Sequence, residues 1–192
     1  REGFLEDLAS LESELGLPLA MKGMIANFDI GFLADVSPRF LFVNIQRSLT
    51  DTIASILRSR VAYAGNEDAW WSFKPPGYQE WMNWSPVEQV AAQVLTTRKH
   101  IEDAFRSIGN NRYININYER FCEAPAEAAR SLRTLLAPHG LVIPLEPFRE
   151  RPYDIRRLPE DSAAQTRSIE QAISIVGDRL GIEPKADDFQ HA

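Results

Sequence analysis

The chain has 192 residues, with an apolar content of 44% and a charged content of 25%, which is typical of one globular domain with a sizeable core. Its net charge of −6 argues against nucleic acid as a partner, because proteins that follow phosphate backbones carry basic surface. The single cysteine, Cys122, excludes an internal disulfide and favours a reducing, cytoplasmic location. The three histidines are dispersed, so we expect no metal site. No apolar run is long enough to predict a membrane span.

The first third of the chain alternates between helical and extended patterns. Residues 4–15 carry leucines at helical spacing and stop at Gly16, which predicts a helix with a glycine end. The apolar run 17–21, which ends at Lys22, predicts a short strand, although Pro18 weakens it. Residues 29–36 predict a short helix that stops before Pro38.

The most informative stretch is the apolar run 40–45, which predicts a fully buried parallel strand. Residues 50–60 follow with helical spacing, so Arg47 lies where a strand ends and a helix begins. In α/β proteins the usual ligand site is the crevice outside the carboxyl ends of the strands. The free amides at the start of the following helix favour anions there. Arg47 and Ser55, eight residues later, would suit a phosphate: the arginine would donate from its charged guanidinium and the serine from its hydroxyl.

Residues 63–84 interrupt the alternation and predict a long aromatic-rich insertion. All four tryptophans lie within it: Trp70, Trp71, Trp81 and Trp84. Two interpretations of this aromatic density stay open. The segment is either part of the core or of a dimer surface, or it is a lid over a bound acceptor.

The rest of the chain resumes the alternation. Ser85 and Glu88 have the spacing of a capping box and predict a helix to about residue 108. Residues 113–118 predict a second core strand, and residues 125–137 and about 160–180 predict helices. Strands separated by helices indicate an α/β fold with a parallel sheet, in one domain spanning residues 1–192.

From about residue 17 to 140 the chain resembles the C-terminal two-thirds of bacterial-type sulfotransferases that use 3′-phosphoadenosine 5′-phosphosulfate (PAPS). Three parts carry the resemblance: the strand 40–45 with Arg47 and Ser55, the helix that opens with Pro86-Val87-Glu88 after a Trp/Pro/Gly/Tyr segment, and the strand 113–118 that ends in Tyr118-Glu119. The order and spacing of the parts are more specific than any one of them.

The resemblance implies a three-layer fold of the P-loop nucleotide-kinase type, with a parallel sheet flanked by helices. It implies that Arg47 and Ser55 bind the 3′-phosphate of PAPS, that Tyr118 lies near the adenine, and that Lys22 lies near the sulfuryl group. A fixed ammonium there stabilises charge that develops on the bridging oxygen, so no metal is needed. The implied acceptor is a hydroxyl or amine of a small molecule, carbohydrate or lipid.

The chain also departs from the family. The phosphosulfate-binding loop that precedes the lysine has no counterpart before Lys22, and Met24 occupies the position where many members have a histidine base. The late basic loop has only weak candidates, namely Arg149, Arg151, Arg156 and Arg157.

Two other functions stay open. A non-catalytic binding or assembly module of the same fold could use the insertion as its partner surface, and a homo-oligomer is compatible with either function. A P-loop kinase is disfavoured, because the sequence has neither a GxxxxGK[ST] loop nor an obvious magnesium aspartate.

Overall fold

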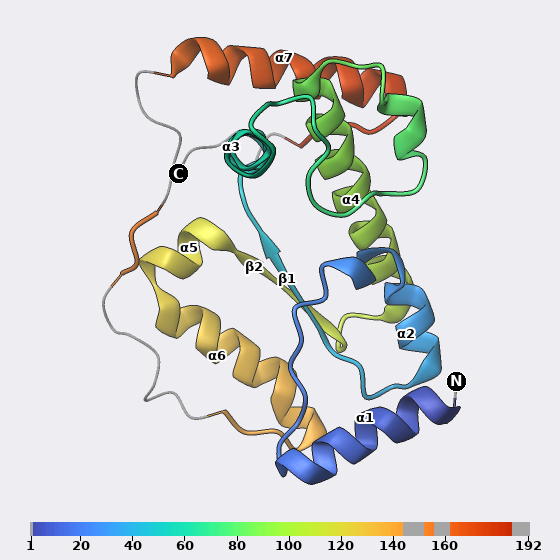
Figure 1. Ribbon diagram of the computed structural model, residues 1–192. Helices are drawn as coiled ribbons and strands as arrows, with labels where there is room; N and C mark the ends of the chain where they lie inside the picture. The colour runs from blue at the N-terminus through green and yellow to red at the C-terminus, as the bar shows by residue number, and fades with distance from the viewer. Residues whose placement is uncertain (1, 144–151, 156–161, 186–192) are drawn as a thin grey trace.

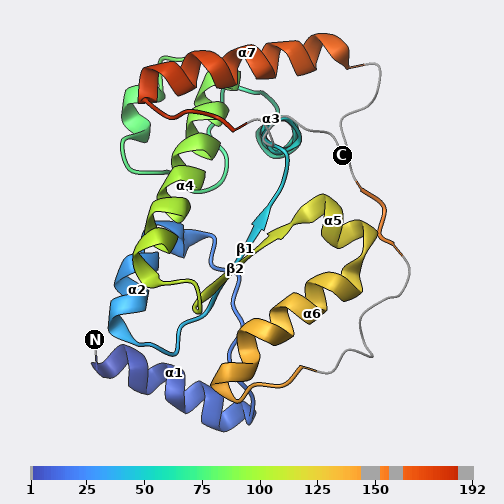
Figure 2. The same ribbon diagram turned by 180° about the vertical axis from the view of Figure 1, so that it is seen from behind.

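The computed structural model describes residues 2–143, 152–155 and 162–185 as a mixed α/β protein that is mostly helical (Figures 1 and 2). The elements in chain order are α1 (Glu2–Leu15), η1 (Ile25–Phe28), α2 (Ile30–Val36), β1 (Phe42–Gln46), α3 (Leu49–Ala64), η2 (Tyr78–Trp81), α4 (Pro86–Ile108), β2 (Tyr113–Asn117), α5 (Tyr118–Glu123), α6 (Pro125–Leu136), η3 (Ala137–His139) and α7 (Ala163–Leu180). The predicted helices and the two later strands are therefore present, while α5 is an addition.

The sheet of the described residues has two strands, β1 and β2, which pair in parallel. The register runs from Phe42 opposite Tyr113 to Gln46 opposite Asn117, so the carboxyl ends of the two strands are level. The prediction of a strand at residues 17–21 was wrong. This segment is irregular and largely exposed, and its Pro18 offers no amide proton to a sheet.

The prediction that the strand at residues 40–45, observed as β1, is fully buried was also wrong. Phe42 packs against Phe105 of α4, with ring centroids 6.3 Å apart. The opposite face of β1 is open, since Val43 is 46% exposed and Ile45 is 61% exposed. An apolar run signals burial of both faces in a larger parallel sheet, whereas among the described residues β1 pairs only with β2.

The main core lies where α3, α4 and α7 meet, at the end of the molecule away from α1 (Figure 1). Ile53 of α3, Val90 of α4 and Ile173 of α7 are fully buried there. The last helix places one apolar face on this core, because Ile169, Ile173 and Val176 are buried and Leu180 packs beside them. This core gives α3 and α4 fixed positions, and α3 begins at the end of β1.

The aromatic insertion packs on this core. Trp81 is 4% exposed, and Trp70, Trp84 and Tyr78 are partly buried against the same cluster. Arg60 of α3 is completely buried beneath the insertion, where its Nη1 donates to the Glu67 carbonyl (3.0 Å) and to Gln89 Oε1 (2.9 Å). Much of the segment is therefore core rather than a free lid.

The capping box at the start of α4 is confirmed. The Ser85 hydroxyl and amide donate to Glu88 Oε2 at 2.7 and 3.1 Å, and the Glu88 amide donates to Ser85 Oγ. Arg179 of α7 lies 2.8 Å from Glu88 Oε1. The side-chain hydrogen bond from Ser85, with help from its backbone amide and Arg179, holds the pKa of Glu88 below its ordinary value.

We expect Glu88→Gln to lower the free energy of unfolding by about 1 kcal/mol at pH 7, because glutamine keeps the cap but loses the charge. A lowered carboxyl pKa contributes stability above the unfolded value of about 4.3, and this stability is lost as pH falls through the folded value. The difference between the variant and the parent should therefore shrink below about pH 4. Urea unfolding at pH 7, 5 and 3 measures the difference in the free energy of unfolding. A difference that is independent of pH would contradict a stabilising role for the Glu88 charge.

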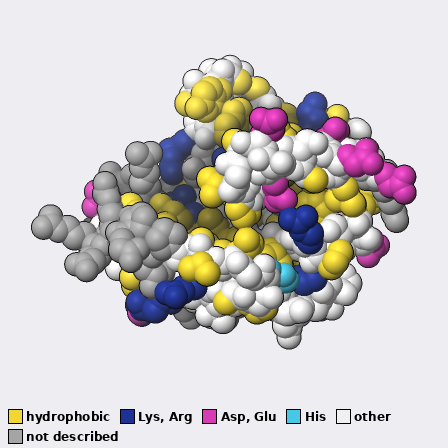
Figure 3. All heavy atoms as spheres, turned by 90° about the horizontal axis from the view of Figure 1, so that it is seen from below, with side chains coloured by type: hydrophobic (Ala, Val, Ile, Leu, Met, Phe, Trp, Pro, Cys, Tyr) yellow, Lys and Arg dark blue, Asp and Glu magenta, His cyan; other side chains and the backbone are white. Residues whose placement is uncertain are grey.

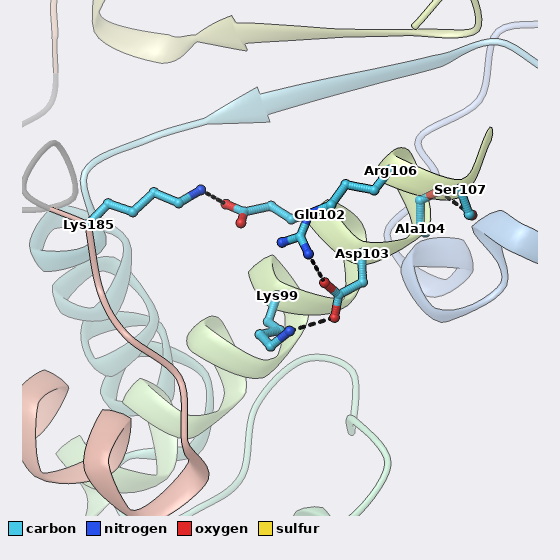
Figure 4. A network of polar contacts seen from close by, with 7 residues as sticks. All are labelled: Lys99, Glu102, Asp103, Ala104, Arg106, Ser107 and Lys185. Carbon is cyan, nitrogen blue, oxygen red and sulfur yellow. Dashed lines mark hydrogen bonds and ion pairs between the residues drawn. The ribbon is translucent and has the colours of Figure 1, made fainter. Parts of the chain in front are cut away.

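The segment after α7 turns back across the sheet side of α4. Gly181, at a φ of 62°, ends the helix, and the Ile182 amide donates to the Gly177 carbonyl. Lys185 then reaches Glu102, with 2.8 Å between Nζ and Oε1, beside the pairs that Asp103 makes with Lys99 and Arg106 (Figure 4). The ion pair between Lys185 and Glu102 ties residues 182–185 to the middle of α4.

At the opposite end, α1 lies on the surface and has no buried residue. Leu11 and Leu15 are exposed, and hydrophobic side chains lie among charged ones on the face viewed from this end (Figure 3). No helix in the described part of the chain combines the length and the hydropathy that crossing a bilayer requires.

Candidate functional site

The carboxyl end of β1 leads directly into α3. Ser48 caps that helix, and its hydroxyl accepts from the Asp51 amide at 3.4 Å. Arg47 is therefore the last residue before the cap, as the sequence predicted. A short polar turn between strand and helix leaves the guanidinium at the crevice where the first amides of α3 also point.

The structure brings Arg47 and Tyr118 together. The guanidinium carbon of Arg47 lies 5.0 Å from the centroid of the Tyr118 ring, within the range of a cation–π contact. The contact follows from the sheet, because each residue comes directly after the last paired residue of its strand, Gln46 or Asn117. Two segments more than seventy residues apart thus meet at the ends of the two strands, where they place an aromatic ring beside a positive charge.

Ser55 lies on the same side of α3 as this charge. Arg47, Asp51 and Ser55 are spaced by four residues, which places the two helical ones one above the other. Ser55 is half-buried, and within the described part of the chain its hydroxyl forms no hydrogen bond. The hydroxyl is therefore available to donate to a ligand.

Two acidic residues of the crevice were not identified from the sequence. Asp51 is 2% exposed, and its Oδ2 lies 4.0 Å from Arg47 Nη2. Glu119 is also buried, and its Oε1 accepts from the Ser48 amide at 3.4 Å. Asp51 orients the guanidinium, and Glu119 ties the end of β2 to the start of α3. The signal for both was their position, within five residues of a strand end.

The Tyr118 phenol is perturbed by its neighbours. A hydrogen bond with the side chain of Cys122, one helical turn further along α5, and burial raise the pKa of Tyr118 above its ordinary value, against the opposing effect of Arg47. The phenol is therefore protonated at neutral pH. Cys122 is itself buried. Together these contacts fix the ring that covers the Arg47 side chain.

Lys22 is not joined to this crevice by any contact among the described residues. It lies exposed in the irregular segment before η1 and forms no hydrogen bond or ion pair there. The predicted strand that was to position it is absent. Met24 follows as the exposed residue before η1, and His100 is half-buried against Phe28, with ring centroids 4.7 Å apart.

The four candidate arginines of a late basic loop, Arg149, Arg151, Arg156 and Arg157, lie outside the described residues. Over residues 2–143, 152–155 and 162–185, no three histidine, cysteine or acidic side chains gather into a possible metal site. Among the described residues, the polar groups named at these strand ends are thus the Arg47 guanidinium, the Ser48 and Ser55 hydroxyls, the Tyr118 phenol and the carboxylates of Asp51 and Glu119.

Comparison with protein-family models, with curated proteins and with solved structures gave no match.

Proposed function

We propose that this chain belongs to a PAPS-dependent sulfotransferase and supplies the binding site for the 3′-phosphate and adenine of the nucleotide. In this proposal, β1 and β2 are part of a larger three-layer parallel sheet of the nucleotide-kinase type. The single observation that carries the proposal is the contact between Arg47 and Tyr118 at the level ends of β1 and β2. A guanidinium for phosphate and an aromatic ring for a base lie side by side there.

The crevice has the donors that a phosphate monoester needs. Arg47 is 20% exposed, so its guanidinium can reach a bound ligand, and Asp51 and Tyr118 restrict its direction. Ser55 adds a hydroxyl without a protein partner among the described residues. Asp51 Oδ2 lies 4.0 Å from Arg47 Nη2, a distance longer than a hydrogen bond.

The reaction would be an in-line transfer. The acceptor oxygen or nitrogen forms a bond to sulfur as the bond between sulfur and the bridging oxygen of PAPS breaks. The products are a sulfate ester or sulfamate and adenosine 3′,5′-bisphosphate, and the acceptor proton passes to solvent. We propose that Lys22 stabilises the negative charge on the departing oxygen.

The test compares two nucleotides that differ only in the 3′-phosphate, adenosine 3′,5′-bisphosphate and adenosine 5′-monophosphate, by isothermal titration calorimetry. We expect the bisphosphate to bind at least tenfold more tightly, and Arg47→Ala to remove this preference, because a charge-assisted contact to phosphate contributes about 1.5–3 kcal/mol. Arg47→Lys should keep part of it.

A matched control is Arg106→Ala, which removes an exposed arginine that pairs with a neighbouring carboxylate on α4, with 3.0 Å between Arg106 Nη1 and Asp103 Oδ1. This control should leave the preference unchanged. Equal affinities of the parent protein for the two nucleotides would rule out a 3′-phosphate site at Arg47.

A further inference from the structure

A cavity of about 460 Å³ lies between η1 and the first half of the aromatic insertion. Ile25 and Phe28 line one side, and residues 73–79 line the other. Its volume is in the range of pockets that hold small organic ligands. It is separate in sequence from the crevice at Arg47, and none of its lining residues was among the site residues expected from the sequence.

Both aromatic walls of the cavity are fixed to α4. His100 Nε2 lies 3.2 Å from the Phe28 carbonyl oxygen, and Gln93 Nε2 donates to the Phe73 carbonyl oxygen at 2.8 Å. Gln93 and His100 are seven residues, or two turns, apart on one face of this long helix. The Phe28 and Phe73 rings are held with their centroids 6.2 Å apart. The walls are therefore set before any ligand binds.

The lining is apolar with one charge. The Phe28, Phe73 and Tyr78 rings and two prolines form most of it. Lys74 supplies the only charged side chain, and its ammonium lies 5.0 Å from the centroid of the Tyr78 ring. No carboxylate of the described residues pairs with Lys74. Flat apolar rings and one ammonium suit a ligand with an aromatic body and a single negative charge.

We infer that this cavity binds an aromatic carboxylate, with the ring packed against the phenylalanines and the carboxylate at Lys74. That this ligand is the sulfuryl acceptor, carrying a phenolic hydroxyl, rests on the proposed function. The chain supports the link, because only two residues separate Lys22 from Ile25 at the cavity wall. Three residue steps extend at most about 11 Å between Cα atoms, so the backbone of Lys22 lies close to the cavity wall.

The test uses two phenols of equal size, 3-(4-hydroxyphenyl)propanoate and its neutral amide. Binding is measured by calorimetry without nucleotide, so that it does not depend on the transfer reaction. We expect the acid to bind more tightly than the amide. Lys74→Met should weaken the acid about tenfold and the amide less than twofold, whereas Lys74→Arg should retain most of the preference.

Two further variants separate the cavity from general effects of charge. Ile25 is 82% exposed, so Ile25→Glu should fold normally while placing a negative charge at the cavity and weakening the acid more than the amide. Lys99→Met removes a lysine of α4 that pairs with Asp103 and should change neither affinity.

The outcomes distinguish this inference from the proposed function. In one outcome, the acid binds in a way that depends on Lys74, but the affinity for adenosine 3′,5′-bisphosphate does not depend on Arg47. This result supports the cavity inference and overturns the proposed function, and with it the acceptor role. Preference for the bisphosphate that depends on Arg47, with no difference between acid and amide or no effect of Lys74→Met, supports the function and overturns the cavity inference.

Discussion

Replacing Trp81 with alanine should lower the free energy of unfolding by about 3–5 kcal/mol, which is the usual effect of truncating a large buried aromatic residue. Trp81 is 4% exposed and lies in the cluster formed by α3, α4 and α7, with Trp84 beside it at 6.3 Å between ring centroids. The cavity left behind cannot collapse easily, because three helices meet around it. Urea denaturation followed by circular dichroism measures the change.

The matched control is Trp71→Ala in the same insertion. Trp71 is only partly buried, and it stacks on Tyr63, an exposed residue, at 5.6 Å between centroids. Its loss should cost about 1 kcal/mol. Equal effects of the two substitutions would show that the insertion is not divided into a core part and a surface part.

Arg60→Ala should also be severe, with a loss of about 3 kcal/mol, whereas Arg60→Met should lie within about 1.5 kcal/mol of the parent. Arg60 is completely buried over Trp70, with its guanidinium carbon 5.3 Å from the ring centroid. Burial lowers the pKa of Arg60, in spite of the acidic neighbours Asp68 and Glu67, so the charge is held at a cost.

Both substitutions remove the donor to Gln89 Oε1, but alanine also leaves a cavity, while methionine fills most of the space without the buried charge. Two guanidinium nitrogens of Arg60, Nε and Nη2, have no hydrogen-bond partner among the described residues, so the charge gains little from its surroundings. Denaturant midpoints of the two variants measure the difference. An equal loss in both would mean that the two hydrogen bonds, and not the volume, hold the insertion.

The helices were predicted well because each has a strong periodic signal and a defined end. The Ser85–Glu88 capping box and Gly16 mark helix ends that the structure confirms, since α4 begins after Ser85 and α1 ends at Leu15. Residues 17–21 were predicted wrongly, because a short apolar run does not distinguish a strand from an exposed irregular segment. Helix α5 was missed, since Tyr118 continues the apolar pattern of β2, although Asn117 caps the helix through its side chain.

The candidate site was predictable in part. The positions of Arg47 and Tyr118 at two strand ends could be read from the sequence, and parallel pairing brought them together. The orientation of Arg47 toward Asp51 could not, because it depends on the side-chain rotamers at the start of α3. The sequence offered the insertion 63–84 as one possible cover for an acceptor, but the cavity at Lys74 was not predictable, since it depends on hydrogen bonds from α4 to the Phe28 and Phe73 carbonyl groups.

The long connection between the two paired strands has a consequence for the order of folding. Asn44 and Asn115, opposite each other in the sheet, are 71 residues apart, so their pairing closes a large loop. The entropy cost of closing this loop arises before contacts between the strands can offset it. The helices α3 and α4 pack locally within that loop and shorten its effective length. We therefore expect helical structure to form first on refolding and the crevice at Arg47 to be among the last parts of the molecule to assemble.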